Sequence, residues 1–147
     1  MDTVDRQARG LLAAGAMLFM LGLLIGFVIP GLTNPRMGVS AHLEGVMNGT
    51  FLLAVGLAWP RVTLGSRARA LALWMLLYGT FANWLFVTLA AVFGTAAMTP
   101  IAAAGHAGTP WQESLVALGL ASVGFTMVVG CGLLVRGFLA KSSLVVA

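Results

Sequence analysis

The chain has 147 residues, of which 60% are hydrophobic and 8% charged, and its mean hydropathy is +1.00. Soluble globular domains average about 25% charged residues. The composition therefore excludes an ordinary soluble domain and favours an integral membrane protein. The net charge of +4 does not indicate nucleic-acid binding, because the basic residues follow the ends of the apolar segments.

Four apolar stretches account for most of the chain and predict helices at about residues 10–30, 40–60, 69–94 and 110–136. Each approaches or exceeds the roughly 20 residues that cross about 30 Å of hydrocarbon. The sequence therefore predicts an all-α integral membrane fold, a four-transmembrane-helix bundle. Residues 1–147 would form one transmembrane domain, with no separate soluble domain.

The basic residues predict how the helices are oriented. Arg36 alone lies between the first two helices, and seven others lie on the opposite side of the expected membrane: Arg6, Arg9, Arg61, Arg67, Arg69, Arg136 and Lys141. Cytoplasmic loops carry the excess of Lys and Arg in membrane proteins. We therefore expect both termini in the cytoplasm and a multi-pass protein in a bacterial inner membrane.

Glycines recur at helical spacing in the first two helices, at positions 15, 22 and 26 and at positions 45, 49 and 56. Small residues allow transmembrane helices to approach closely. Helix packing is the simpler interpretation, but the second set borders His42 and Asn48, so contact with a flat ligand is an alternative there. The two sets exceed what one bundle needs, which favours an oligomer.

Helix-capping residues predict where two of the helices begin. Ser40 is a candidate N-cap for the second helix. Thr109, Pro110 and Gln112 predict a capping box at the start of the fourth helix. The stretch 95–107, rich in Gly and Ala, is expected to be a surface or re-entrant loop.

Polar side chains within the apolar helices are the candidate functional residues: His42, Glu44 and Asn48 in the second helix and Asn83 in the third. Ionisable groups inside a membrane are costly and usually functional. At a rise of 1.5 Å per residue, Asn48 and Asn83 lie roughly 12 Å and 16 Å below the outer ends of their helices. Consecutive helices are commonly neighbours, so we expect a shared pocket, with His42, Gly45, Glu44 and Asn48 on one broad face.

Each polar residue also has a structural interpretation. His42 could be a hydrogen-bonded structural residue, and intramembrane asparagines often bond helices together. Glu44, expected in the first helical turn, could stabilise the helix dipole. A lone membrane histidine cannot build a zinc site, but it can hold a haem iron at one axial position.

Three segments, 34–49, 78–84 and 105–113, closely resemble hydroxylaminobenzene mutases over a match that runs from about residue 8 to 138. These membrane isomerases convert aryl hydroxylamines to 2-aminophenols in nitroarene degradation. The chain is more distantly similar to styrene oxide isomerase, with which it shares an Ala-His pair followed after five residues by Asn-Gly, and an Ala-Asn pair in the third helix. Styrene oxide isomerases are homotrimers with haem b at their subunit interfaces.

The resemblance implies roles for the polar residues. His42 would be the axial ligand of a haem b iron, with Gly45 and Gly49 at the cofactor. Asn48, Asn83 and Glu44 would be catalytic, acting on a small apolar aromatic substrate in a homotrimer.

Two positions depart from the isomerase pattern, since Val87 replaces a Tyr and Glu44 replaces a Gly. Both departures favour the mutase reaction. The alternatives are an epoxide isomerase, a haem-bearing electron-transfer subunit and a non-catalytic membrane assembly subunit.

Overall fold

The computed structural model describes residues 2–140, and all elements in this range are helical. The four long helices are α1 (Thr3–Val28), α2 (Pro35–Ala58), α3 (Ser66–Phe93) and α5 (Pro110–Leu139). Short helices lie between them: Ile29–Gly31, Trp59–Arg61 and α4 (Pro100–Ala103). The four long helices are long and apolar enough to cross a membrane. The prediction of an all-α protein with four membrane-length helices is confirmed.

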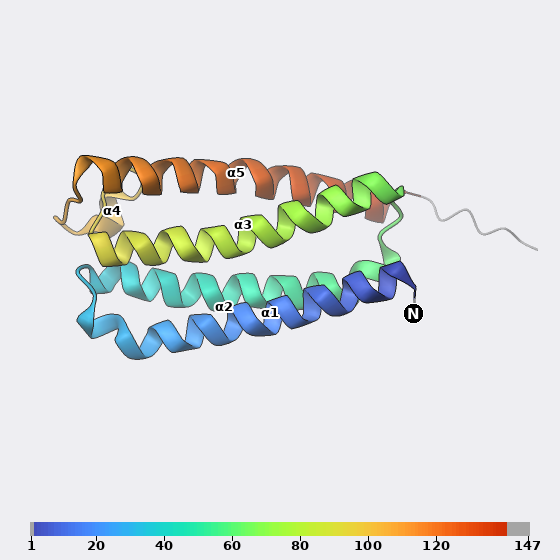
Figure 1. Ribbon diagram of the computed structural model, residues 1–147, viewed down its shortest axis with the longest axis horizontal. Helices are drawn as coiled ribbons and strands as arrows, with labels where there is room; N and C mark the ends of the chain where they lie inside the picture. The colour runs from blue at the N-terminus through green and yellow to red at the C-terminus, as the bar shows by residue number, and fades with distance from the viewer. Residues whose placement is uncertain (1, 141–147) are drawn as a thin grey trace, which may run out of the picture.

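The long helices pack as two antiparallel pairs (Figure 1). One pair is α1 with α2, the other is α3 with α5, and contacts between α2 and α3 join the pairs. The start of α1 and the end of α5 lie at the same end of the molecule (Figure 1). Side chains between α2 and α3 are therefore at the centre of the protein.

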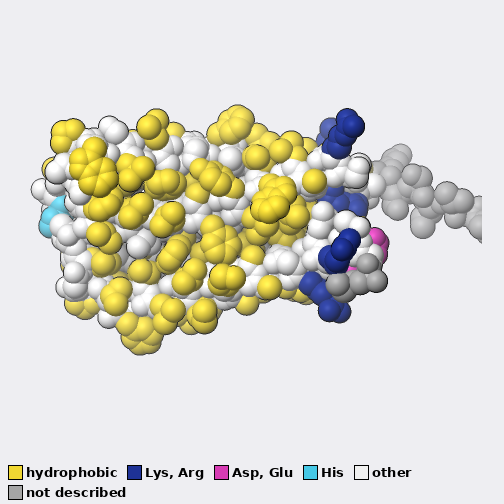
Figure 2. Space-filling model, viewed as in Figure 1, with side chains coloured by type: hydrophobic (Ala, Val, Ile, Leu, Met, Phe, Trp, Pro, Cys, Tyr) yellow, Lys and Arg dark blue, Asp and Glu magenta, His cyan; other side chains and the backbone are white. Residues whose placement is uncertain are grey.

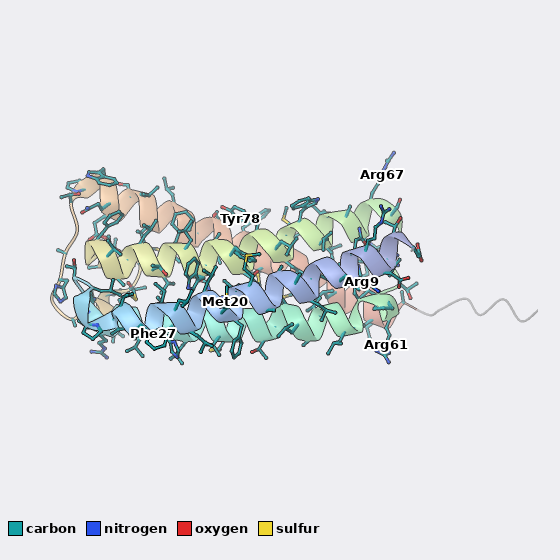
Figure 3. The ribbon with its side chains drawn as sticks, turned by 60° about the horizontal axis from the view of Figure 1, so that its bottom comes forward. Arg9, Met20, Phe27, Arg61, Arg67 and Tyr78 are labelled. Atoms are coloured by element: carbon teal, nitrogen blue, oxygen red, sulfur yellow. The ribbon has the colours of Figure 1, made fainter. Side chains whose placement is uncertain are left out.

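Charged side chains gather at one end of the molecule, beside apolar side chains that cover the rest of the visible face (Figure 2). Figure 3 places Arg9, Arg61 and Arg67 at this arginine-rich end. Phe27, on α1 nearer the other end, is 83% exposed. Exposed large apolar side chains between polar ends are what a membrane environment requires. Lys141, counted above with the basic residues, lies outside the described residues.

The second helix begins earlier than the sequence predicts. Asn34 rather than Ser40 is the N-cap of α2, and its side chain accepts a hydrogen bond from the backbone N–H of Met37 at 3.0 Å. Pro35 occupies the first helical position, which suits its fixed backbone and missing N–H. Ser40 is inside α2, so its predicted capping role is wrong. Glu44 is consequently in the third turn, and the prediction that it answers the helix dipole from the first turn is wrong too.

The glycines of α1 and α2 pack against each other within one chain. A Cβ added to Gly22 would lie 2.6 Å from the backbone N of Val46, and one added to Gly49 would lie 2.5 Å from the backbone N of Phe19. A Cβ at Gly45 would overlap the Cα of Gly22. Close backbone approach therefore explains these glycines, as predicted for α1. The prediction that they exceed the needs of one bundle is wrong, so they give no support to an oligomer.

The end of the molecule opposite the arginine-rich end, which we call the loop end, is closed by residues 94–109 and by the start of α2. Asn34 is fully buried there, and its side-chain amide donates to the carbonyls of Ala102 and Ala103 at 3.0 and 3.1 Å. Its backbone N–H donates to the carbonyl of Ala91. Asn34 thus joins α2 to α4 through its side chain and to α3 through its backbone, a role that the sequence did not predict.

Glu113 holds the same loop to α5. Its carboxylate accepts hydrogen bonds from the backbone N–H groups of Ala96, Ala97 and Gly108 at 2.8 to 3.0 Å. The predicted capping box is confirmed beside it, where the Gln112 side chain accepts from the Thr109 N–H at 2.8 Å. The predicted surface loop is therefore an ordered cap that contains the short helix α4.

Candidate active site

Three of the polar residues singled out from the sequence meet between α2 and α3. Glu44 Oε2 accepts a hydrogen bond from Asn48 Nδ2 at 3.1 Å and a shorter one from Asn83 Nδ2 at 2.6 Å. Asn48 is one helical turn beyond Glu44, and Asn83 comes from the antiparallel neighbour. The predicted proximity of the two asparagines is confirmed, and Glu44 is the residue that joins them.

The carboxylate determines how both amides are oriented. A carboxylate accepts hydrogen bonds and cannot donate one, so both amides must turn their NH2 groups toward it. Glu44 is the tenth residue of α2, roughly 14 Å from the start of the helix at 1.5 Å per residue. Two charge-assisted hydrogen bonds compensate in part for placing a carboxylate at that depth.

One carboxylate oxygen is left over. Both amides donate to Oε2, and within residues 2–140 no donor is hydrogen-bonded to Oε1 of Glu44. Oε1 is also not among the enclosed atoms that lack a partner, and Glu44 is partly exposed. The Glu44 cluster, which we define as Glu44, Asn48 and Asn83, therefore offers an accessible acceptor to a bound molecule.

His42 faces α1 instead of the Glu44 cluster. Its Nδ1 lies 2.8 Å from the backbone carbonyl of Gly22, and because a carbonyl only accepts, Nδ1 carries the proton. A Cβ added to Gly26 would lie 3.2 Å from the same nitrogen. The predicted single broad face is thus divided, with His42 toward α1 and the Glu44 cluster toward α3.

Gly45 and Trp84 separate the two parts. A Cβ added to Gly45 would lie 3.0 Å from Trp84 Cδ1, and the same glycine packs on Gly22. The indole N–H of Trp84 is enclosed and has no hydrogen-bond partner within the described residues. Gly45 and Gly49 have a packing role against α1, and a contact of either with a cofactor stays a prediction.

The chemistry of His42 fits a haem ligand. Its Nδ1–H is tied to a backbone carbonyl, which leaves the Nε2 lone pair free, and metal-ligating histidines commonly have this arrangement. Among residues 2–140 no group of three or more His, Cys, Asp or Glu side chains could hold a metal ion. A porphyrin brings four nitrogen ligands of its own, so a single histidine suffices for it.

These features define a class of protein, a small multi-pass membrane protein with a carboxylate and two amides joined across two central helices. The chain belongs to the styrene oxide isomerase family, whose model matches residues 7–139.

Two relatives come from Ectopseudomonas oleovorans and are named as hydroxylaminobenzene mutases, which are isomerases. Hydroxylaminobenzene mutase HabB is 53% identical over 131 residues, which cover 88% of this chain and 80% of the relative. Hydroxylaminobenzene mutase HabA is 48% identical over 107 residues, which cover 72% of this chain and 79% of the relative. No solved structure matches the chain.

Proposed function

We propose that this protein is a membrane isomerase that rearranges aryl hydroxylamines such as hydroxylaminobenzene to 2-aminophenols. The proposal is supported by the names of the two relatives and by the Glu44 cluster. The single observation that carries it is the carboxylate of Glu44, held by two amides between membrane-length helices with one oxygen unused. An apolar aromatic substrate dissolves in the bilayer, which is a reason for placing such a site there.

The reaction has no net redox change and conserves all atoms. The N–O bond breaks, a C–O bond forms at the ortho carbon, and the ring carbon loses a proton. The nitrogen gains a proton, so that the N–H of the hydroxylamine becomes the NH2 of the aminophenol, and a proton taken up by the leaving oxygen is lost again when the C–O bond forms. Protons must therefore be both delivered and removed in each turnover. Glu44 is the group suited to relay these protons. The second N–H of Asn48 and of Asn83 can stabilise charge that develops on the leaving oxygen.

A haem b group would be held by His42 through Nε2, because Nδ1 is occupied by Gly22. When bound, its iron would supply a Lewis acid for the N–O group. Gly22 and Gly26 on α1 would keep the imidazole from turning, since its Nδ1 is bonded to one and packed on the other.

The arrangement in the cell is part of the same proposal. We place both ends of the described chain and the loop between α2 and α3 in the cytoplasm of a bacterial inner membrane, because six of the seven described arginines lie at that end. We also propose a homotrimer with haem at its subunit interfaces. A cytoplasmic reporter fused after residue 147 should be active, and mass measurement in detergent should give three chains. Activity only with a periplasmic reporter, or a fully active monomer, would contradict these assignments.

An epoxide isomerase is the second candidate, because the matching family model is described as styrene oxide isomerase. One experiment separates the two. Purified protein is incubated without oxygen with phenylhydroxylamine or with styrene oxide, and its visible spectrum is recorded. We expect 2-aminophenol from the first substrate and little phenylacetaldehyde from the second. The reverse preference would contradict the mutase proposal.

The cofactor is tested separately with His42→Ala. Because His42 is the only histidine within the four long helices, this variant should lose the haem absorption band and the activity together. A wild-type preparation that is fully active without haem or iron would refute the cofactor assignment. Haem retained by the variant would mean that another residue is the ligand, and His106 would be tested next.

A further inference from the structure

We infer that the unused oxygen of Glu44 selects substrates that carry an N–H or O–H donor at the reacting centre. The inference rests on the proposed function and deepens it, because it names Glu44 as the residue that separates hydroxylamines from epoxides. An aryl hydroxylamine has two such donors, one on nitrogen and one on oxygen. An epoxide has none, since its oxygen only accepts hydrogen bonds.

The hydrogen bonds of the Glu44 cluster occupy only one of the two carboxylate oxygens. Asn48 and Asn83 both donate to Oε2, at 3.1 and 2.6 Å, so this oxygen is occupied. Oε1 remains an accessible and charged acceptor with no partner among residues 2–140. The amide oxygens of the two asparagines point away from the carboxylate, because their NH2 groups face it, and they too have no partner in the described part of the chain.

No protein donor of the described chain is hydrogen-bonded to Oε1 of Glu44. The enclosed indole N–H of Trp84 has no acceptor among residues 2–140, so it does not donate to Oε1. His42 directs its proton to the Gly22 carbonyl on the opposite side of α2. The arginine side chains gathered at one end in Figure 2 lie at the arginine-rich end, and Arg36, at the loop-end start of α2, is eight residues, roughly 12 Å along the helix, from Glu44. A donor for Oε1 must therefore come from the bound molecule or from water carried with it.

Oε1 of Glu44 should make the protein discriminate between hydroxylamines and epoxides, and not only bind the hydroxylamine more tightly. A site built to accept a hydrogen bond rejects an analogue that lacks the donor, because the acceptor is then desolvated and left unpaired. The penalty is larger for a charged acceptor than for a neutral one. An epoxide would incur this penalty at Glu44, whereas phenylhydroxylamine would satisfy Oε1 with its O–H or N–H and still accept from the second amide N–H groups.

The test uses four probes, three methylated analogues of phenylhydroxylamine and styrene oxide. O-methyl-N-phenylhydroxylamine keeps the N–H, N-methyl-N-phenylhydroxylamine keeps the O–H, and the N,O-dimethyl compound has neither; styrene oxide is the fourth probe. Equilibrium binding is measured to the wild-type protein, loaded with its cofactor, in lipid nanodiscs, with empty nanodiscs as the control for partition into lipid. Turnover of phenylhydroxylamine is measured on the same preparation.

We expect the wild-type protein to bind the two donor-bearing analogues on the order of 10- to 100-fold more tightly than the N,O-dimethyl compound and styrene oxide, as a hydrogen bond to a charged group implies. In Glu44→Gln, this preference should fall to about threefold or less, because the charged acceptor is gone. Tyr78→Phe is the matched control, because it removes the hydrogen bond that joins Tyr78 of α3 to Ser122 of α5 and should keep the full preference.

Several results would overturn the inference. Equal binding of all four compounds to the wild-type protein would refute the inference. This outcome needs no variant, so it holds even if Glu44→Gln folds poorly. A preference that survives in Glu44→Gln would assign the selection to another residue. If the preference is absent while phenylhydroxylamine is turned over, the inference fails and the proposed function stands. If phenylhydroxylamine is not turned over by a protein that shows the preference, the proposed function fails and the acceptor role of Glu44 stands.

Discussion

Glu44 and Glu113 are the two glutamates of the chain, and the structure uses them in opposite ways. Both carboxylate oxygens of Glu113 accept hydrogen bonds from backbone N–H groups of the segment 94–109. One oxygen of Glu44 accepts from two side-chain amides, and the other has no donor within the described part of the chain. The first carboxylate is saturated and near the surface, whereas the second is half used and lies among apolar helices.

The difference shows how a structural carboxylate can be told from a reactive one. A saturated carboxylate has no capacity left for a ligand, and its hydrogen bonds to the backbone order a loop. Removing a carboxylate from water costs free energy, and hydrogen bonds to only one of its two oxygens offset that cost in part. Such an arrangement is expected where a substrate completes it, so changes near Glu44 should alter turnover and changes near Glu113 should alter stability.

Among changes to the residues that surround Glu44, removing one amide should give the largest effect on turnover. In Asn83→Ala the carboxylate loses its shorter hydrogen bond, that at 2.6 Å. A hydrogen bond to a charged group is worth about 1.5–3 kcal/mol, so turnover should fall on the order of 10- to 100-fold if the bond orients Glu44 in the transition state. Thr88→Ala, on the same helix, removes only a bond to the Trp84 carbonyl and should keep its turnover. Equal turnover in the two variants would remove Asn83 from the site.

Widening the α1–α2 contact should affect stability strongly and both parts of the site at once. In Gly45→Ala the new methyl group would overlap Gly22, whose carbonyl holds His42. Overpacking of this kind costs about 1–3 kcal/mol, and we expect a lower unfolding midpoint in denaturant and a disturbed haem spectrum. Gly124→Ala is the control, because nothing lies within 4 Å of that position. A Gly45→Ala protein as stable as the control would contradict the close approach.

Replacing Asn34 should lower the stability of the loop end, the part of the molecule that Glu113 also holds together. Asn34→Ala removes an N-cap, a change that costs about 0.5–2 kcal/mol, and leaves the carbonyls of Ala102 and Ala103 without their donor. Asn34→Asp keeps the cap, since Asp and Asn are equally good N-caps. We nevertheless expect it to be destabilised, because its carboxylate would face two carbonyl oxygens. Denaturation of the three proteins decides this, and an Asp variant as stable as wild type would mean that only the cap counts.

Replacing Glu113 should give the smallest effect on activity. Glu113→Gln loses the charge that strengthens the hydrogen bonds to the loop amides. The melting temperature should fall and the segment 94–109 should be cut faster by protease, while turnover of the folded protein stays close to wild type. A large loss of turnover with an unchanged melting temperature would give Glu113 a catalytic role and remove the contrast with Glu44.

The sequence was sufficient for features that depend on apolar patterns. The length of uncharged runs predicts the four helices. Counting residues from the helix ends predicts that Asn48 and Asn83 are neighbours, although the count starts at Ser40 and the helix begins at Pro35. The glycine spacing predicts the face by which α1 packs. Each of these follows from a regular helix and needs no knowledge of distant partners.

Features that use backbone groups could not be predicted from the sequence. Asn34 bonds to carbonyls 68 and 69 residues away, and Glu113 to an N–H group 17 residues away. The His42 side chain donates to the backbone carbonyl of Gly22. Because every residue has such a carbonyl, the residue type at position 22 does not reveal this hydrogen bond. The early start of α2 had one signal, the Asn34-Pro35 pair, because Asn is a good N-cap and Pro suits the first helical position.

Glu44→Gln and Glu113→Gln, prepared in the same way, test the proton-relay role of Glu44 most directly. Turnover of phenylhydroxylamine, haem content and melting temperature are measured on each protein. If Glu44 relays protons, Glu44→Gln should lose about 10²–10⁴ in turnover, the usual range for a lost general acid–base, with unchanged haem content, while Glu113→Gln loses mainly thermal stability. Near-wild-type turnover in Glu44→Gln would contradict the account and leave the Glu44 cluster as a link between two helices.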